Sequence, residues 1–173
     1  MTQYSNRMII VHWLVLAMMI VAWFLGDTVD EARHEGSATI IAYVAHALVG
    51  AAVLLLTLAR LFFRSKDGVP PPLGDTPADK LAQLIKYLLY AVSILLPMSG
   101  TMQVLTSDVG KAILAWDAAM LPKKFEGVMA HGVHEMLVNV LIVLVVVHVL
   151  GALKHQFVLK DNIMGRMLPG NKG

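Results

Sequence analysis

Seven histidines and no cysteines define the metal chemistry open to this chain of 173 residues. Without cysteine, the chain cannot form disulfides, thiolate zinc sites, iron–sulfur clusters or covalent c-type haem attachments. Neutral imidazole, by contrast, is a good ligand for iron, zinc and copper. The positions of the histidines are therefore the first feature to explain.

Four histidines fall within long apolar stretches, at two depths. His12 lies about one turn inside the first stretch, and His148 lies one to two turns before the end of the fourth. His46 lies about two turns inside the second stretch, and His134 lies near the start of the fourth. Because successive spans run in opposite directions, His12 and His148 are expected near one membrane face. His46 and His134 are then expected near the other.

The spacing on the fourth stretch sharpens this pattern. Fourteen residues separate His134 from His148, which is about 1400° of helical rotation and within about 40° of a whole number of turns. The two imidazoles therefore share one helix face, about 21 Å apart along the axis. With one histidine at matching depth on each of two other helices, the pattern is typical of two stacked bis-histidine haems. Two axial imidazoles leave no open iron position, so such haems pass electrons.

Other interpretations of these histidines differ in what they require. A polar residue in a span can simply hydrogen bond a neighbouring helix. A zinc or copper site needs three or four ligands at one point, which two separate depths disfavour. A proton relay needs ionisable groups through the bilayer, and the middle of these spans offers none between the two histidine layers. A metal or proton transporter without haem nevertheless stays an alternative.

The composition explains what holds the histidines. Hydrophobic residues make up 57% of the chain and charged residues 15%, with a mean hydropathy of +0.68, whereas soluble domains are roughly 25% charged. The net charge of +2 indicates no nucleic-acid partner. A bilayer core needs about 20 apolar residues per helix. We therefore predict an all-α membrane four-helix bundle in contact with lipid, as one domain over residues 1–173, with spans at about 8–25, 40–63, 84–105 and 133–153.

The loop charges predict an orientation. Of the 14 Lys and Arg residues, four fall in the segments 26–39 and 107–130, and the other ten fall on the opposite side. The positive-inside rule then places both termini in the cytoplasm. The first stretch lacks a convincing small-residue cleavage site, so we interpret it as a retained span.

The remaining histidines have weaker assignments. His155, seven residues after His148, is either an interfacial anchor or a proton-handling group beside the inner haem. His131 could replace His134 as a ligand, but its partner 14 residues on would be Val145, so a surface role is favoured. His34 is expected to be a solvated loop residue.

Several cations have two open interpretations. Arg7, Arg60 and Arg64 either anchor helix ends or contact haem propionates. Lys123 and Lys124 are either solvated loop charges or steer a small anion toward the outer haem.

The chain resembles the bacterial cytochrome b561 family over nearly its whole length. The resemblance rests on the N-terminal R-M-I-I-V-H-W, on the third-span Y-L-L-Y and L-L-P-M-S-G, on the H-x13-H spacing with the later His155, and on the tail K-D-N…R-M-x-P. These elements together are more specific than any one of them.

The resemblance implies a membrane cytochrome with two b-type haems that exchanges electrons with the quinone pool. The ligands that it implies are His12 with His148 for the inner haem and His46 with His134 for the outer haem. Some members are similar to superoxide oxidases, which pass an electron from superoxide to ubiquinone.

We therefore expect an oxidoreductase of the bacterial inner membrane. It would take electrons from superoxide or another periplasmic donor at the outer haem and reduce ubiquinone beside His155. The alternative within electron transfer is a subunit that serves a separate dehydrogenase or periplasmic redox partner.

Overall fold

The fold is a bundle of four long helices. The structure is a computed structural model that describes residues 3–72 and 74–168. The long helices are α1 (Asn6–Glu35), α2 (Ile40–Asp67), α3 (Pro77–Thr106) and α5 (Met129–Leu153), and all are long and apolar enough to cross a membrane. Within the described ranges every regular element is helical. The prediction of an all-α membrane protein with four spans is confirmed.

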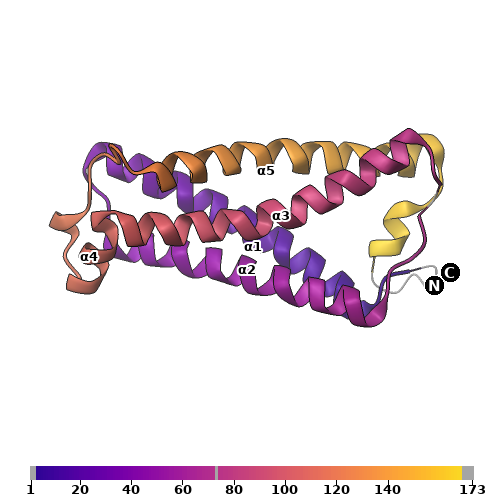
Figure 1. Cartoon of the computed structure of the whole chain (residues 1–173), viewed down its shortest axis with the longest axis horizontal. Coiled ribbons are helices and arrows are strands. Elements are labelled where there is room, and N and C mark those ends of the chain that lie inside the picture. Colours follow the sequence, from indigo (N-terminus) through magenta and orange to yellow (C-terminus); the bar gives the residue numbers. More distant parts are fainter. Residues whose placement is uncertain (1–2, 73, 169–173) are drawn as a thin grey trace.

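Short elements join and extend the long helices. Helix α4 (Asp108–Ala115) and a 3-10 turn at Ala118–Met120 lie between α3 and α5, and a π-helical segment (Lys154–Leu159) and a 3-10 turn (Ile163–Met167) follow α5. Figure 1 shows α4 at one end of the bundle and both chain termini at the other. We call these two ends the α4 end and the terminal end.

Side chains just before three of the long helices fix where they begin. The hydroxyls of Ser5 and Thr39 accept hydrogen bonds from backbone N–H groups of the first turns of α1 and α2. The Thr76 hydroxyl does the same for α3. The Asp79 carboxylate in turn accepts a hydrogen bond from the Thr76 backbone N–H, which completes a capping box. Pro77 occupies the first turn of α3, where its missing N–H costs nothing.

Helix α1 is longer than the sequence predicted. The segment 26–39 was expected to be a loop that contains His34, but α1 continues to Glu35 and ends at Gly36 in the left-handed conformation, with φ 75°. A hydropathy profile detects the part of a helix that lies in the hydrocarbon core of the bilayer, and it does not detect polar turns that extend beyond it. Here the polar turns are held by Arg33, which is buried, pairs with Asp30 and donates to the Lys123 carbonyl at 2.9 Å.

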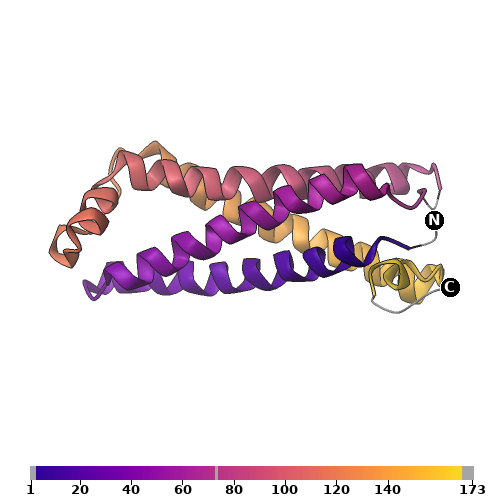
Figure 2. The same cartoon turned by 90° about the horizontal axis from the view of Figure 1, so that it is seen from below.

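The long helices associate in two pairs that are joined through α2 and α3. Helix α1 packs along α2, α3 packs along α5, and α2 also contacts α3 (Figures 1 and 2). Among the described residues, α3 is the long helix against which the backbone of α5 packs. The core between α3 and α5 has the three- and four-residue spacing of packed helices. Its members are Val92, Leu137 and Leu144, flanked by Ile85, Leu89, Leu96 and Leu141.

The C-terminal segment closes the terminal end. Trp13 Nε1 on α1 donates to the Met167 carbonyl at 2.8 Å, and Arg166 Nη1 donates to the Pro71 carbonyl at 2.8 Å. The Tyr4 backbone N–H donates to the Arg166 carbonyl at 3.2 Å. These bonds tie the 3-10 turn after α5 to α1 and to the α2–α3 connection.

Packing between α3 and α5 gives a stability prediction. Leu144→Ala removes a side chain that is 7% exposed and leaves a cavity, so it should lower the free energy of unfolding by about 2 kcal/mol or more. Val143→Ala changes the neighbouring, 61% exposed residue and should cost about 0.5 kcal/mol or less. Thermal unfolding in detergent measures both. Equal effects would show that α3 and α5 do not pack through this face.

Candidate functional site

Two imidazoles meet near the terminal end. His12 projects from α1 and His148 from α5, and their ring centroids lie 6.4 Å apart with an interplanar angle of 69°. Both residues are half-buried. The His12 ring also makes an edge contact with Trp13, whose centroid is 5.3 Å away. We call His12 and His148 the terminal-end pair.

A second pair lies nearer the α4 end. His46 projects from α2 and His134 from α5, with ring centroids 6.2 Å apart and an interplanar angle of 80°. Both are half-buried. We call His46 and His134 the α4-end pair. The structure thus brings together the same two pairs that the sequence placed at matching depths.

The spacing within each pair is that of two ligands on one metal ion. With a metal–nitrogen bond of about 2 Å and a ring nitrogen roughly 1.2 Å from its centroid, imidazoles on opposite sides of a metal have centroids about 6.4 Å apart. Direct ring stacking would allow shorter distances. The observed 6.2 Å and 6.4 Å therefore suit one metal between the rings of each pair.

Hydrogen bonds orient the rings of the α4-end pair. His46 Nδ1 lies 3.0 Å from the Ala22 carbonyl oxygen, and His134 Nδ1 lies 3.1 Å from that of Leu96. A carbonyl can only accept, so the proton sits on Nδ1 and leaves the Nε2 lone pair free. The Ser99 hydroxyl lies 3.0 Å from His134 Nδ1 and donates to the Leu96 carbonyl at 2.7 Å. Metal-binding histidines commonly have this arrangement.

The donor set restricts what these pairs can hold. In the part of the chain that the structure describes, no three His, Asp or Glu side chains gather as a metal site. A structural zinc site would need four protein ligands. Two opposed imidazoles suit a metal that brings its own equatorial ligands, as iron in a porphyrin does.

The three predicted arginines have different surroundings. Arg7 pairs with Asp67 and lies over the Phe63 ring at 4.7 Å. Arg64 lies over the Tyr87 ring at 5.8 Å. Arg60 is half-buried over the Tyr90 ring at 5.2 Å, and its Nε atom is buried with no hydrogen-bond partner among the described residues. Of the three, Arg60 is thus the arginine whose buried donor atom lacks a partner among the described residues.

His155 has a partner that the sequence analysis did not identify. Its Nδ1 lies 2.5 Å from Asp161 Oδ2 at the terminal end, and both side chains are largely shielded from solvent. The π-helical segment and Lys160, in the left-handed conformation with φ 55°, bring the two together. Helical periodicity does not predict such a turn. The presence of an aspartate six residues after His155 was a signal in the sequence that could have suggested this partner.

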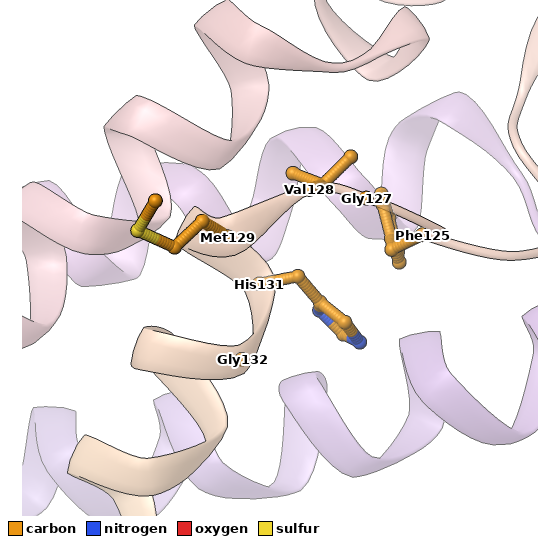
Figure 3. A pocket seen from close by; sticks show the side chains of 6 residues that line it. All are labelled: Phe125, Gly127, Val128, Met129, His131 and Gly132. Atoms are coloured by element: carbon orange, nitrogen blue, oxygen red, sulfur yellow. The ribbon is translucent and has the colours of Figure 1, made fainter.

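A shallow cavity of about 450 Å³ opens at the α4 end (Figure 3). It is lined by Phe125, Gly127, Val128, Met129, His131 and Gly132. The rings of Phe125 and His131 have centroids 4.4 Å apart, and His131 Nε2 lies 3.2 Å from Glu135 Oε1. The sequence assigned His131 a surface role but did not identify Phe125, which stands alone in a loop without periodicity.

The two predicted anion-steering lysines lie near this cavity and are exposed. Lys124 Nζ lies 3.6 Å from Glu126 Oε1. Lys123 accepts the Arg33 hydrogen bond through its backbone carbonyl. His34 lies in the last turn of α1, exposed, with Nδ1 2.8 Å from the Asp30 carbonyl.

Comparison with known proteins gives a consistent family. The model of the family described as prokaryotic cytochrome b561 matches residues 3–170. The chain is 32% identical to cytochrome b562 of Cereibacter sphaeroides, over 95% of this chain and 94% of that protein. No solved structure matches.

Two further relatives have lower identity. The chain is 28% identical to the probable superoxide oxidase CybB of Yersinia pestis, over 99% of this chain and 98% of that protein. It is 26% identical to cytochrome b561 homolog 1 of Escherichia coli, over 99% and 100%. Pro169, the last residue of the tail motif, lies outside the described residues.

Proposed function

The chain belongs to the prokaryotic cytochrome b561 family, and on that premise we propose that it carries electrons across a membrane through two b-type haems. Family membership makes it a membrane electron-transfer protein with b-type haem. The observation that carries the two-haem proposal is the spacing of both histidine pairs, 6.4 Å and 6.2 Å between centroids. His12 and His148 would hold one haem iron, and His46 and His134 the other.

The backbone beside the α4-end pair supports this assignment. A Cβ at Gly26 would lie 3.0 Å from His46 Cε1, and a Cβ at Gly100 would lie 3.2 Å from His134 Cε1. Because glycine has no Cβ, it leaves room at both positions for the imidazole ring to lie close to the backbone of the neighbouring helix. Haem held by two imidazoles supplies one-electron redox chemistry without an open iron position.

Arg60 is the best placed of the three arginines to contact a haem propionate. Its buried Nε has no hydrogen-bond partner in the described structure, whereas Arg7 is already paired with Asp67. Arg64 and Arg7 remain proposed contacts at the same end of the bundle. A guanidinium is well suited to a carboxylate because it offers several donors in one plane.

We place the protein in the bacterial inner membrane with both termini in the cytoplasm. The support is the loop charge: ten of the 14 Lys and Arg residues fall outside the segments 26–39 and 107–130. The α4 end then faces the periplasm and receives electrons, and the terminal end reduces ubiquinone.

His155 is the proposed quinone contact. The Asp161 carboxylate accepts a hydrogen bond from His155 Nδ1–H. When the ring also carries a proton on Nε2, that N–H would donate to a quinone carbonyl. Reduction of one quinone to quinol consumes two electrons and two protons. The electrons arrive one at a time, and His155 is positioned to pass protons from the aqueous edge of the terminal end.

Superoxide is a proposed donor at the α4 end. The support is the name of one relative, probable superoxide oxidase, at 28% identity over nearly the whole chain. Lys123 and Lys124 are the cations near the cavity that an anionic donor would meet. Lys123 is the more effective of the two, because Lys124 lies close to Glu126.

The haem content tests the core of the proposal. Pyridine haemochrome quantification of the purified protein should give two b-type haems per chain, with sharp low-spin bands on reduction. His46→Ala and His148→Ala should each leave one haem, while His34→Ala, at an exposed position far from both pairs, should leave two. A single haem in the unaltered protein would mean that one pair is assigned wrongly. No haem at all would favour the transporter.

Quinone reduction tests His155 and Asp161. Asp161→Asn removes the negative charge and offers His155 an amide N–H, which favours the wrong tautomer, so the rate of quinol formation should fall about tenfold or more, as in other histidine–carboxylate pairs. His155→Ala should lower it at least as far. The control Asp75→Asn removes an exposed carboxylate at the same end and should change nothing. Unchanged rates with full haem content would place the quinone elsewhere.

The donor is tested with superoxide and the purified protein. Lys123→Ala should lower the rate of superoxide oxidation about two- to threefold at low ionic strength, and the difference should shrink as salt screens the charge. Lys80→Ala, at the terminal end, is the matched control. No oxidation of superoxide by protein that carries both haems would point to a separate redox partner as donor.

A further inference from the structure

Arg60 occupies a position on α2 that matches a histidine position on α5. It follows His46 by 14 residues, the same interval that separates His134 from His148. This interval moves about 21 Å along a helix and returns to nearly the same face. Since His46 lies beside His134, Arg60 lies at the depth of His148. The side chain of α2 that reaches the terminal-end pair is therefore a cation.

No acidic side chain neutralises Arg60 in the described structure. Arg7 and Arg33 each have an aspartate partner, Asp67 and Asp30. Arg60 has only the Tyr90 ring, and its buried Nε is without a hydrogen-bond partner. A half-buried charge acts over a longer range than a solvated one, because less water screens it.

The other charges nearest the two histidine pairs differ in sign at the two ends. Apart from Glu135, which directly follows His134, no Asp, Glu, Lys or Arg lies between the two layers on the four long helices. The first charged residues at or beyond the terminal-end pair are all basic: Arg7 on α1, Arg60 on α2, Lys86 on α3 and Lys154 directly after α5. The charged residues nearest the α4-end pair along the chain are acidic: Asp27 on α1, Asp108 just after α3, and Glu135 on α5.

We propose that Arg60, supported by Lys86, raises the midpoint potential of the haem at the terminal-end pair above that at the α4-end pair and so sets the direction of electron transfer. Reduction adds one negative charge to a haem, which a nearby cation stabilises and a nearby anion opposes. With two haems bound, one electron would pass from the α4-end haem, which would be oxidised, to the terminal-end haem, which would be reduced, with no bond made or broken. This inference rests on the proposed two-haem function.

The role of Arg60 in this proposal is that of a positioning residue that acts through the haem. It explains why electrons accepted at the α4 end collect beside His155, where the quinone is reduced. Both haems would be held by two histidines, so their ligands alone would not make their midpoint potentials differ. The charged residues around them would.

The test is a potentiometric titration of the visible spectrum. His46→Ala keeps the terminal-end haem alone, and His148→Ala keeps the α4-end haem alone, so the two midpoint potentials can be assigned. The terminal-end haem should have the higher potential. Arg60→Met and Arg60→Gln should lower the midpoint potential of the terminal-end haem and leave that of the α4-end haem unchanged. Arg60→Lys keeps the positive charge, so the potential of the terminal-end haem should stay close to its original value. Lys66→Met, which removes an exposed charge from the same helix and end, is the control.

The outcomes separate this inference from the function on which it rests. Fewer than two haems in the unaltered protein would overturn the proposed function itself. Two haems whose potentials lie in the reverse order would overturn the inference alone, even if every Arg60 variant failed to fold. A correct order that Arg60→Met and Arg60→Gln do not disturb would overturn the role of Arg60.

Discussion

The distance between two imidazoles constrains the whole bundle. If each pair holds one haem iron, as proposed, the two ring centroids of a pair have to lie about 6.4 Å apart. Helix α5 supplies one ring to each pair. Its rotation about its own axis and its position along that axis are therefore both constrained by the two pairs. The packing of Leu137 and Leu144 against Val92 on α3 holds α5 at that setting. Helix α3 contributes no histidine to either pair, and its part is to support the helix that contributes two.

The features that the sequence predicted are those that follow from regular helices. The four spans and the pairing by depth depend on hydropathy and on a fixed rise and rotation per residue, which hold throughout a membrane-spanning helix. The same reasoning failed for the polar part of a helix. The last turns of α1 continue as helix beyond Leu25, where Arg33 pairs with Asp30 on α1 and donates to the Lys123 carbonyl in a distant loop. Hydropathy carries no information about such partners.

The partners of two functional candidates were missed for a related reason. Asp161 reaches His155 only because a π-helical segment and a left-handed residue reverse the chain. Phe125 reaches His131 from a loop that has no repeating pattern. The first contact depends on backbone conformations that are individually rare and the second on an irregular loop, so a periodic interpretation of the sequence cannot find either. The histidines themselves were found because they lie on regular helices.

The shared use of α5 restricts how the family can vary in length. An insertion of one residue between His134 and His148 would turn one of them by about 100° and shift it by about 1.5 Å relative to the other. Only one pair could then keep its spacing, and the helix could not slide on α3 to restore the second. The 69–77 connection and the loop between α4 and α5 carry no such restriction, since neither spans the distance between the pairs. Homologous chains should therefore differ in length in these connections, while the interval within α5 stays fixed.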